Sequence, residues 1–389
     1  MTDRPIYLDT NATTPVDPRV AAAMQPYLTD HFGNPSSGHD PGQACRAAVE
    51  TARRQLAALL GARSEEIVFT SGGTEANNAV LAGIAERAGH GAHFVVSAVE
   101  HPAILNPCRW LEDRRGIRVT VVPVDGHGRV DPADVEAAMT PRTALVSVMH
   151  ANNEVGTLQP VRAIADIAHA GGALMHTDAA QSLGKVAVDV DALGVDFLSV
   201  AGHKFYAPKG VGALYIRAGV ELASLLHGAG QERGRRAGTE NVLAIVGLGA
   251  AAEIAGRELG ADAAHSRALR DRLWTALRAG IPDLRLHGHP EERLPNTLSV
   301  AIVGIEAGLL VVMLGDRVAM SAGAACHAGA ADVSTVLQAM GVPEACARGT
   351  IRLSVGRMTT AAEVDRAAGI LVEAVAQARR PRAPSARAT

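Results

Sequence analysis

Lys204 has the chemistry needed to hold an aldehyde cofactor. It follows a short apolar run, Phe197–Val200, and lies directly after Gly202 and His203. A lysine amine can form a Schiff base with an aldehyde once it has lost its proton, and burial lowers the pKa at which this happens. A lysine in this setting is, taken alone, more often a solvated loop residue. The inference therefore depends on the residues that accompany it.

Asp178 is the first of these accompanying residues. It directly follows the apolar run Ala173–Thr177. In doubly wound sheets, ligands bind at the carboxyl ends of the strands. A carboxylate there can pair with the pyridinium nitrogen of pyridoxal 5′-phosphate and keep the ring an effective electron sink. An aspartate that only caps the next helix is the alternative, but the position of Lys204 after the next predicted strand favours the cofactor.

A glycine turn before a predicted helix can supply a phosphate site. The run Phe69–Asn77 ends a strand at Thr70, turns at Gly72 and Gly73 and begins a helix near Thr74. Exposed N–H groups and hydroxyls at a helix N-terminus bind phosphate. The run is neither a P-loop nor a G-x-G-x-x-G motif, and an ordinary turn is the alternative.

Cys326 is a candidate nucleophile. It lies next to His327 within a run of small residues, Met320–Gly329, which predicts a mobile loop. The neighbouring imidazole could help stabilise the thiolate, which is the nucleophilic form. The other cysteines fall in helical or turn settings that favour inert thiols: Cys45, Cys108 and Cys346. No C-x-x-C pair is present, so neither a disulfide framework nor a metal site is expected.

Three further polar residues follow predicted strands. Arg357 lies just after Ile351–Ser354, where a guanidinium can bind an α-carboxylate through two hydrogen bonds. Asn153 is a second candidate for contact with a substrate. His101 could stack on a cofactor ring or move protons. A surface arginine and an ordinary loop histidine are the alternatives.

The elements that must position these residues alternate between short apolar runs and amphipathic stretches. This alternation is typical of an α/β fold with a mostly parallel sheet. The predicted strands are Ile67–Thr70, His93–Ser97, Val119–Pro123, Ala144–Met149, Ala173–Thr177, Phe197–Val200 and Gly212–Ile216. The predicted helices are Gly42–Leu60, Glu75–Arg87, Ala103–Arg115, Asp131–Met139 and Val161–Ala170.

The pattern changes after about residue 250. Two helices are expected there, near Val242–Leu259 and Ala264–Ala279, followed by strands near Thr297–Ile302 and Ile351–Ser354. We predict a large domain over residues 15–255 and a small α+β domain formed by residues 1–14 and 256–378, with the Cys326 loop in the small domain. The tail, residues 379–389, is rich in Arg, Pro and Ala and is expected to be disordered.

Composition limits the possible partners. The chain has 389 residues, 20% of them charged, and a net charge of −3, which is ordinary for a globular protein and does not favour a nucleic-acid partner. No apolar run reaches the roughly 18 residues of a membrane span. The N-terminus lacks a secretion-signal pattern, so a cytoplasmic location is expected, with no membrane partner.

Taken together and in order, nine motifs resemble those of cysteine desulfurases and selenocysteine lyases, which are class-V, fold-type I pyridoxal-phosphate enzymes. The motifs include Thr-Ser-Gly-Gly-Thr-Glu at 70–75, Glu-His-Pro at 100–102, Gly-His-Lys at 202–204, the run Gly230–Asn241 and the Cys326 segment. The resemblance covers about residues 6–375. It implies a mostly parallel mixed sheet in the large domain, a smaller α+β domain and a homodimer.

The resemblance also implies roles for residues around the cofactor. Lys204 would form the Schiff base and Asp178 would hold the pyridinium nitrogen. Gln181 would contact the phenolic oxygen, and His101 would stack on the ring. Three residues would bind the phosphate within one subunit: Gly73, Thr74 and His203.

The remaining implied roles concern the second subunit and the substrate. Thr239, in the loop Gly230–Asn241, would reach the phosphate of the other subunit, and that loop is expected to fold against the partner. Asn153 and Arg357 would bind the substrate carboxylate. Cys326 would receive sulfur as a persulfide, for delivery to an acceptor protein or a reductant.

Three functions stay open on the sequence alone. L-cysteine desulfuration is favoured. A selenocysteine lyase acting on L-selenocysteine is the first alternative, because Gly323–His327 and the run Arg352–Arg357 look closer to such lyases. An aminotransferase or β-lyase without a catalytic cysteine is the second. Ala201 departs from the serine that many desulfurases carry there, so the phosphate would have one donor fewer.

Overall fold

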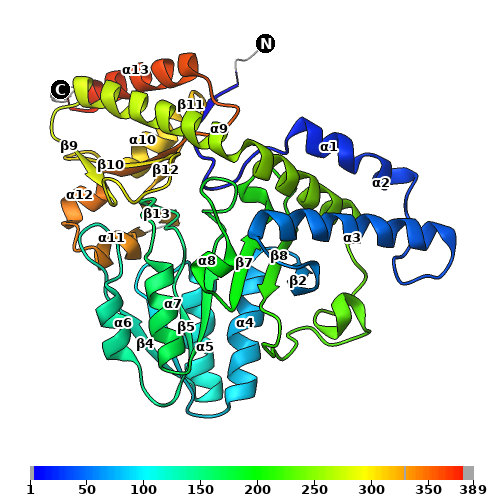
Figure 1. The fold of residues 1–389 in the computed structure, drawn as a ribbon. Coiled ribbons are helices and arrows are strands. Elements are labelled where there is room, and N and C mark those ends of the chain that lie inside the picture. Colours follow the sequence, from blue (N-terminus) through cyan, green and yellow to red (C-terminus); the bar gives the residue numbers. More distant parts are fainter. Residues whose placement is uncertain (1–3, 328–329, 380–389) are drawn as a thin grey trace, which may run out of the picture.

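A computed structural model of the chain describes residues 4–327 and 330–379. Its larger, lower part is built on a seven-stranded sheet and its smaller, upper part on a four-stranded sheet (Figure 1). The predicted α/β class is confirmed. The predicted division at residues 255 and 256 stays a prediction. Residues 380–389, most of the tail expected to be disordered, lie outside the described residues.

The seven-stranded sheet is mixed and mostly parallel. Its order is β2 (Ile67–Thr70), β8 (Gly212–Ile216), β7 (Phe197–Ala201), β6 (Leu174–Asp178), β5 (Thr143–Ser147), β3 (His93–Ser97) and β4 (Arg118–Val122). Only β8 runs antiparallel to its neighbours in this sheet. The strands read as continuous apolar runs because helices cover both faces. Each predicted strand of this sheet lies within two residues of the observed bounds.

Alternate side chains of one strand enter different cores. Phe94 and Val96 on β3 pack with α4 (Gly73–Ala88) and α5 (Pro102–Arg115). Val95 packs in the core on the other face. That second core is formed with four helices: α3 (Asp40–Leu60), α6 (Pro132–Ala138), α7 (Val161–Ala170) and the first half of α9 (Val242–Gly280). The sheet is thus held between two helical layers, and only its strand ends are open to a ligand.

The smaller sheet is entirely antiparallel. Its order is β12 (Ser321–Ala322), β15 (Thr350–Ser354), β10 (Thr297–Ile302) and β9 (Leu284–His287). It shares a core with the second half of α9, α10 (Ala307–Leu314) and α13 (Ala361–Ala378). The remaining short elements are α1 (Pro18–Met24), α2 (Pro26–Thr29), α8 (Val190–Leu193), α11 (Thr335–Ala339), α12 (Glu344–Arg348) and the parallel pair β1 (Ile6–Tyr7) and β11 (Val318–Ala319).

Helix α9 links the two parts. The expected pair of helices near Val242–Leu259 and Ala264–Ala279 is wrong, because α9 runs unbroken for 39 residues. Gly260 inside a helix costs only about 1 kcal/mol relative to alanine. Burial on both sides outweighs this cost, since residues up to Ala255 pack in the lower core and Leu269 onward in the upper core.

An N-terminal strap, residues 8–15, connects the two sheets at their adjoining edges. The Asn11 backbone N–H donates to Ser354 Oγ at 2.9 Å, and Asn11 Nδ2 donates to Thr297 Oγ1 at 2.8 Å. The Thr14 N–H donates to the His203 carbonyl at 2.9 Å, just beyond β7. The strap therefore lies against the carboxyl end of the large sheet.

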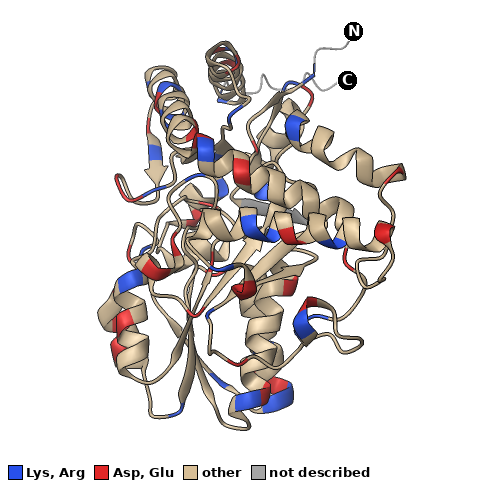
Figure 2. Ribbon diagram, turned by 45° about the vertical axis from the view of Figure 1, so that its right-hand side comes forward, with Lys and Arg blue, Asp and Glu red and all other residues tan. Residues whose placement is uncertain are grey.

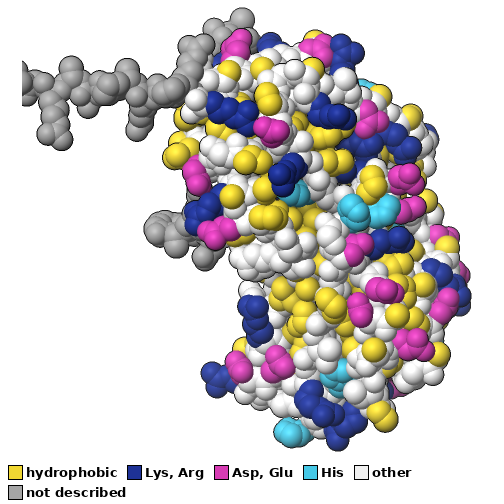
Figure 3. Space-filling model, turned by 90° about the vertical axis from the view of Figure 1, so that its left-hand side faces the viewer, with side chains coloured by type: hydrophobic (Ala, Val, Ile, Leu, Met, Phe, Trp, Pro, Cys, Tyr) yellow, Lys and Arg dark blue, Asp and Glu magenta, His cyan; other side chains and the backbone are white. Residues whose placement is uncertain are grey.

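Charge is spread over the molecule. Positions of Lys and Arg are interspersed with positions of Asp and Glu along the ribbon (Figure 2). On the face seen in Figure 3, hydrophobic side chains gather at the narrow waist, and charges of both signs surround them. Among the helices of the described residues, none is both long enough and apolar enough to span a bilayer.

Candidate active site

The predicted site residues converge on one cavity of about 360 Å³ at the carboxyl ends of β5, β6 and β7. Eight of the predicted residues line it: Gly73, Thr74, His101, Asn153, Asp178, Gln181, His203 and Lys204. Asn11, Asn77 and Arg352 also line it, and none of these three was predicted as a site residue. Thr239 and Arg357 lie elsewhere.

Two backbone carbonyl groups hold the side-chain amine of Lys204 in place. It ends a single 3₁₀ turn, Gly202–Lys204, directly after β7. Its Nζ donates to the carbonyls of Asn11 at 2.6 Å and Ala12 at 2.8 Å. Burial, and next the positive charge of Arg352, lower the pKa of Lys204 to about 8. A substantial neutral fraction of the amine is therefore present near neutral pH.

Asp178 ends β6 on the cavity floor, where two donors fix its carboxylate. Asn77 Nδ2 donates to Oδ2 at 2.7 Å, and the Ala180 N–H donates to Oδ1 at 2.9 Å. Asn77 lies on the first turn of α4 and is 1% exposed. Its Oδ1 is buried without a partner among the described residues. The sequence signal that could have identified Asn77 is its position three residues after Thr74, which places both on one side of the helix.

The turn into α4 forms a cradle for an anion. Gly72 precedes the helix with φ of 154°, a conformation that glycine alone adopts readily. N–H groups in the first turn of a helix have no partner within it. A Cβ on Gly73 would lie 3.3 Å from the Ala201 Cβ, so larger residues would narrow the cradle. An ion pair of 2.9 Å between Glu75 and Arg236 fixes the turn from outside.

Two histidines flank this cradle. His203 Nδ1 lies 3.1 Å from Thr13 Oγ1, and burial lowers the pKa of His203 to about 4, so its imidazole is neutral near neutral pH. His101 caps α5, with Nδ1 accepting from the Ala103 N–H at 3.0 Å. The proton of its neutral ring is therefore on Nε2. Desolvation lowers the pKa of His101, opposed by the carboxylate of Asp178.

Gln181 is bound at both ends of its amide. Its Nε2 donates to the Asn11 carbonyl at 2.9 Å, and its Oε1 accepts from Lys185 Nζ at 2.8 Å. Asn11 and Lys185 are both polar residues that the sequence did not single out. The contacts of Asn11 come from segments far apart in the chain.

Arg352, and not Arg357, reaches the cavity. Arg352 lies in the middle of β15, where its Nη1 donates to the Asn153 carbonyl at 2.9 Å and its Nη2 to Asp9 Oδ1 at 2.8 Å. Its Nε is buried without a partner among the described residues. A guanidinium beside Asn153 with an unpaired donor suits a carboxylate ligand.

The position of Arg357 does not support its expected role. Its guanidinium pairs with Asp17 at 3.1 Å and Asp262 at 2.8 Å and lies over the Tyr206 ring, 4.4 Å from the centroid. Its side chain is only 8% exposed. Both of its neighbouring carboxylates are therefore paired with it, and Arg357 does not line the 360 Å³ cavity, although its Nε has no hydrogen-bond partner among the described residues.

Thr239 is exposed and lines a different cavity, with Ser71 and Gly210. Its loop was expected to fold against a partner. That expectation stays a prediction. Within the same chain, Glu232 anchors the loop, accepting from Arg53 Nη1 at 2.7 Å and from the Phe69 N–H at 2.9 Å. Both charged side chains of this pair are at most 5% exposed.

Cys326 lies on β13 (Ala324–His327), which pairs antiparallel with β14 (Ala330–Val333). The expected loop is therefore a hairpin in its backbone. The side chain of Cys326 lies outside what the structure describes. Just after β14, Ser334 Oγ donates to Glu154 Oε2 at 2.5 Å, and Glu154 directly follows the cavity residue Asn153. The hairpin is thus joined to the rim of the cavity.

The cavity has the groups that pyridoxal phosphate requires. An amine of lowered pKa, a fixed carboxylate and a helix N-terminus surround one space, and Asn77 and Arg352 present unpaired polar atoms. Lys204 would hold the carbonyl carbon, Asp178 the pyridinium nitrogen, and Gly73 and Thr74 the phosphate.

Comparison with known proteins agrees with this geometry. The chain matches the aminotransferase class-V family over residues 6–367. It is 49% identical over 377 residues to a cysteine desulfurase of Gluconacetobacter diazotrophicus, covering 96% of this chain and 94% of that protein.

Two solved structures are similar along most of the chain. A NifS-like protein has a TM-score of 0.90 at 39% identity, covering 96% of this chain and all of that one (100%). SspA, solved in complex with cysteine, has a TM-score of 0.79 at 36% identity, covering 91% of this chain and 99% of that one. The family resemblance drawn from the motifs is confirmed: this chain belongs to the aminotransferase class-V family and is a pyridoxal-phosphate-dependent enzyme.

Proposed function

We propose that this protein is a cysteine desulfurase that converts L-cysteine to L-alanine and passes the sulfur to Cys326. The observation that carries the proposal is the convergence of Lys204, Asp178 and Arg352 on one cavity, whose rim is joined to the Cys326 hairpin. Two of the similar proteins described above support the substrate, one being named a cysteine desulfurase and the other solved with cysteine.

The residues divide the reaction between them. Arg352 and Asn153 bind the substrate carboxylate and present the Cα–H bond to Lys204. Bound pyridoxal phosphate supplies an electron sink for the pair of electrons released at Cα. Lys204, as a neutral amine, takes the Cα proton. Asp178 would hold the pyridinium nitrogen of the bound cofactor and favour its protonated form.

Sulfur transfer then takes place at Cys326. Its thiolate attacks the substrate sulfur, so an S–S bond forms as the Cβ–S bond breaks and the electron pair of that bond stays with the carbon. Cβ then takes up a proton and Cα regains one, so the organic product leaves as alanine. The persulfide on Cys326 passes its outer sulfur to an acceptor protein or a thiol reductant.

Substituting Cys326 tests this assignment. We expect Cys326→Ala to abolish alanine release from L-cysteine and to leave visible absorption by the cofactor unchanged. Cys346→Ala, at a buried free cysteine, is the matched control and should retain turnover. Near-normal desulfuration by Cys326→Ala would overturn the proposal. Turnover of L-selenocysteine alone by that variant would favour a selenocysteine lyase.

The attachment of the cofactor can be mapped directly. The chain has only three lysines, Lys185, Lys204 and Lys209. Borohydride reduction of the holoenzyme followed by peptide mapping should therefore label Lys204 without ambiguity. Label on either of the other lysines would contradict the assignment.

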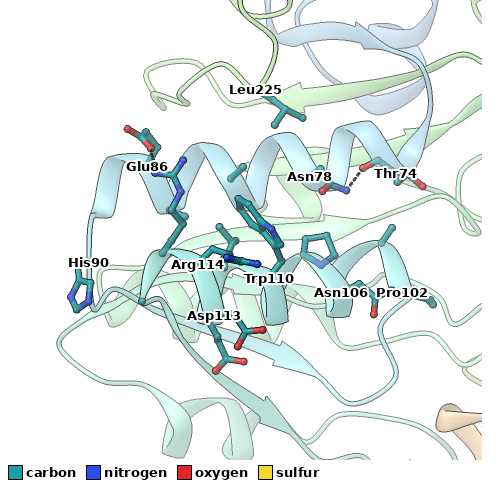
Figure 4. Close-up of a pocket in the computed structure, with 18 of the residues that line it drawn as sticks. Thr74, Asn78, Glu86, His90, Pro102, Asn106, Trp110, Asp113, Arg114 and Leu225 are labelled. Carbon is teal, nitrogen blue, oxygen red and sulfur yellow. Dashed lines mark hydrogen bonds and ion pairs between the residues drawn. The ribbon is translucent and has the colours of Figure 1, made fainter.

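We also propose that the enzyme works as a homodimer. A hollow of about 1270 Å³ lies between α4 and α5, with Trp110, Asn106 and Leu225 on its walls (Figure 4). It is continuous with the cofactor cavity, because Thr74 and His101 line both. Trp110 is 52% exposed there, a large apolar surface for a second subunit to cover.

Subunit mixing tests whether Thr239 acts across that interface. Lys204→Ala and Thr239→Asp should each be inactive alone, the second because a carboxylate repels the phosphate. Mixed dimers place both defects in one site and leave the other intact, so about a quarter of wild-type activity should return. Absence of recovery despite subunit exchange would place Thr239 outside the partner's site.

A further inference from the structure

Lys185 is a lysine next to the cavity that the reaction above does not use. Its Nζ donates to Gln181 Oε1 at 2.8 Å and lies 3.4 Å from Asn11 Oδ1. Among the described residues, no Asp or Glu forms an ion pair with it. Burial, then the charges of Lys204 and Arg352, lower its pKa well below the usual range. Burying an amine costs free energy unless its hydrogen bonds compensate for the lost contact with water.

Composition suggests that this position requires lysine. The chain has three lysines in 389 residues, and arginine supplies every other basic side chain. All three lysines lie between residues 185 and 209, and Lys204 lines the cofactor cavity. Lysine differs from arginine in being compact and in losing its proton readily when buried.

The local backbone directs Lys185 back onto Gln181. The Lys185 N–H donates to the Ser182 carbonyl at 3.0 Å, closing a turn. Gly184 within this turn has φ of 75°, and a Cβ there would lie 2.9 Å from the Phe205 Cβ. The turn therefore requires glycine, and it brings a side chain four residues after Gln181 to the same place as the Gln181 amide.

The amide of Gln181 has two distinct ends, and its partners select one orientation. Oε1 can only accept and Nε2 can only donate. Lys185 supplies a donor on one side, and the Asn11 carbonyl supplies an acceptor on the other. Nε2 carries two hydrogens, so one remains for a group inside the cavity, which Gln181 lines.

We propose that Lys185 is a positioning residue that turns the Gln181 amide so that the cavity receives an N–H donor and not a carbonyl oxygen. The group that benefits is an anionic oxygen of the bound cofactor, since a reversed amide would repel it. The inference rests on the proposed function, because it assigns Gln181 to the cofactor.

A double-mutant cycle tests this. Lys185→Met keeps the length of the side chain and removes its donor, and Gln181→Leu removes the amide. Each single variant should weaken pyridoxal-phosphate binding to the apoprotein by about 2- to 12-fold, the loss of one hydrogen bond. Each should also raise the pH midpoint of the bound cofactor's visible absorption, because the donor stabilises the deprotonated oxygen. The double variant should show no further change in either quantity.

Two controls keep the outcomes distinct. Lys209→Met, at an exposed lysine, should leave both quantities unchanged. Thermal unfolding of all variants reports any general loss of stability, which would add in the double variant. Additive effects of Lys185→Met and Gln181→Leu, or no effect of Lys185→Met, would overturn the inference. Failure of the proposed function would look different, since the wild-type protein would then release no alanine from cysteine.

Discussion

Two regions of the site differ in how many contacts hold them: the cavity floor, formed by Asp178 and Gln181, and the Cys326 hairpin, formed by β13 and β14. On the floor, Asp178 and Gln181 are each bound by two groups, drawn from α4, the strap and the loop after β6. The hairpin strands β13 and β14 pair only with each other among the described strands. A two-stranded sheet is marginally stable by itself, so its placement depends on contacts such as the one between Ser334 and Glu154.

This difference separates two kinds of chemistry. The groups proposed to hold the cofactor lie at the end of a buried sheet. The proposed sulfur acceptor, Cys326, lies on a two-stranded hairpin that pairs with no other described strand. Changes on the floor should therefore affect both cofactor and turnover, whereas changes at the hairpin should affect turnover alone.

The largest effect is expected for Lys204→Ala. Loss of the amine removes both the covalent partner of the cofactor and the base for the Cα proton. The rate of alanine release should fall by at least about 100- to 10,000-fold, the range for loss of a positioned acid or base. The variant should also fail to retain label after borohydride. A rate within tenfold of wild type would show that the floor is not the catalytic region.

The two arginines give the next sharpest contrast. Arg352→Gln should lower kcat/KM for cysteine by about 10- to 150-fold, because charge-assisted hydrogen bonds to a carboxylate are worth about 1.5–3 kcal/mol. Arg357→Gln removes the ion-pair partner of Asp262 and one of the two arginines that pair with Asp17, and should cost about 3–5 kcal/mol of unfolding free energy with little change in KM. Steady-state kinetics and chemical denaturation of both variants distinguish the binding role of Arg352 from the structural role of Arg357. The reverse pattern would return the carboxylate site to Arg357.

A moderate effect is expected at the hairpin anchor. Ser334→Ala removes the hydroxyl that donates to Glu154, and persulfide formation should slow by about 2- to 12-fold with the cofactor spectrum unchanged. Glu154→Gln retains an acceptor of the same shape and should behave nearly like wild type. Burial raises the pKa of Glu154. Loss of cofactor in Ser334→Ala would show that the two regions are not separable.

The last prediction concerns pH and needs no substitution in the wild-type protein. Lys204 attacks the cofactor only as a neutral amine, and its pKa of about 8 lies below the ordinary 10.5. The rate of pyridoxal-phosphate uptake by the apoprotein should therefore rise about tenfold per unit well below that pKa and level off above it. Stopped-flow absorbance from pH 6 to 10 measures this. The positive charge of Arg352 helps lower this pKa, so Arg352→Gln should move the plateau to higher pH.

Most of the fold and the floor of the site could be predicted from local patterns. Strands β2, β3 and β8 have the predicted bounds because apolar runs flanked by turns are a local signal. Lys204, Asp178 and Thr74 were found because each follows such a run. The contacts of Asn11, Asn77 and Lys185 were not predicted, because they depend on segments that are distant in the sequence.

The choice between Arg352 and Arg357 shows where local patterns fail. Both stand in one short run, and either could bind a carboxylate. The decision rests on β15 pairing with β10 and β12, which places Arg352 opposite Ser299 and Ser321 at the centre of the small sheet. Similarly, the continuity of α9 is set by two cores that lie at its opposite ends, and no local signal reports them.

The strap has a consequence for biosynthesis. The hydrogen bond from the Asn11 N–H requires Ser354, which lies 343 residues later in the chain. At elongation rates of about 5–20 residues per second, the strap waits roughly 20–70 s before its partner strand exists. Its sequence, Leu-Asp-Thr-Asn-Ala-Thr-Thr-Pro, is polar enough to stay solvated during that interval. The large sheet can form while translation continues, but the strap cannot complete its contacts beside the cofactor site until residue 354 has been made.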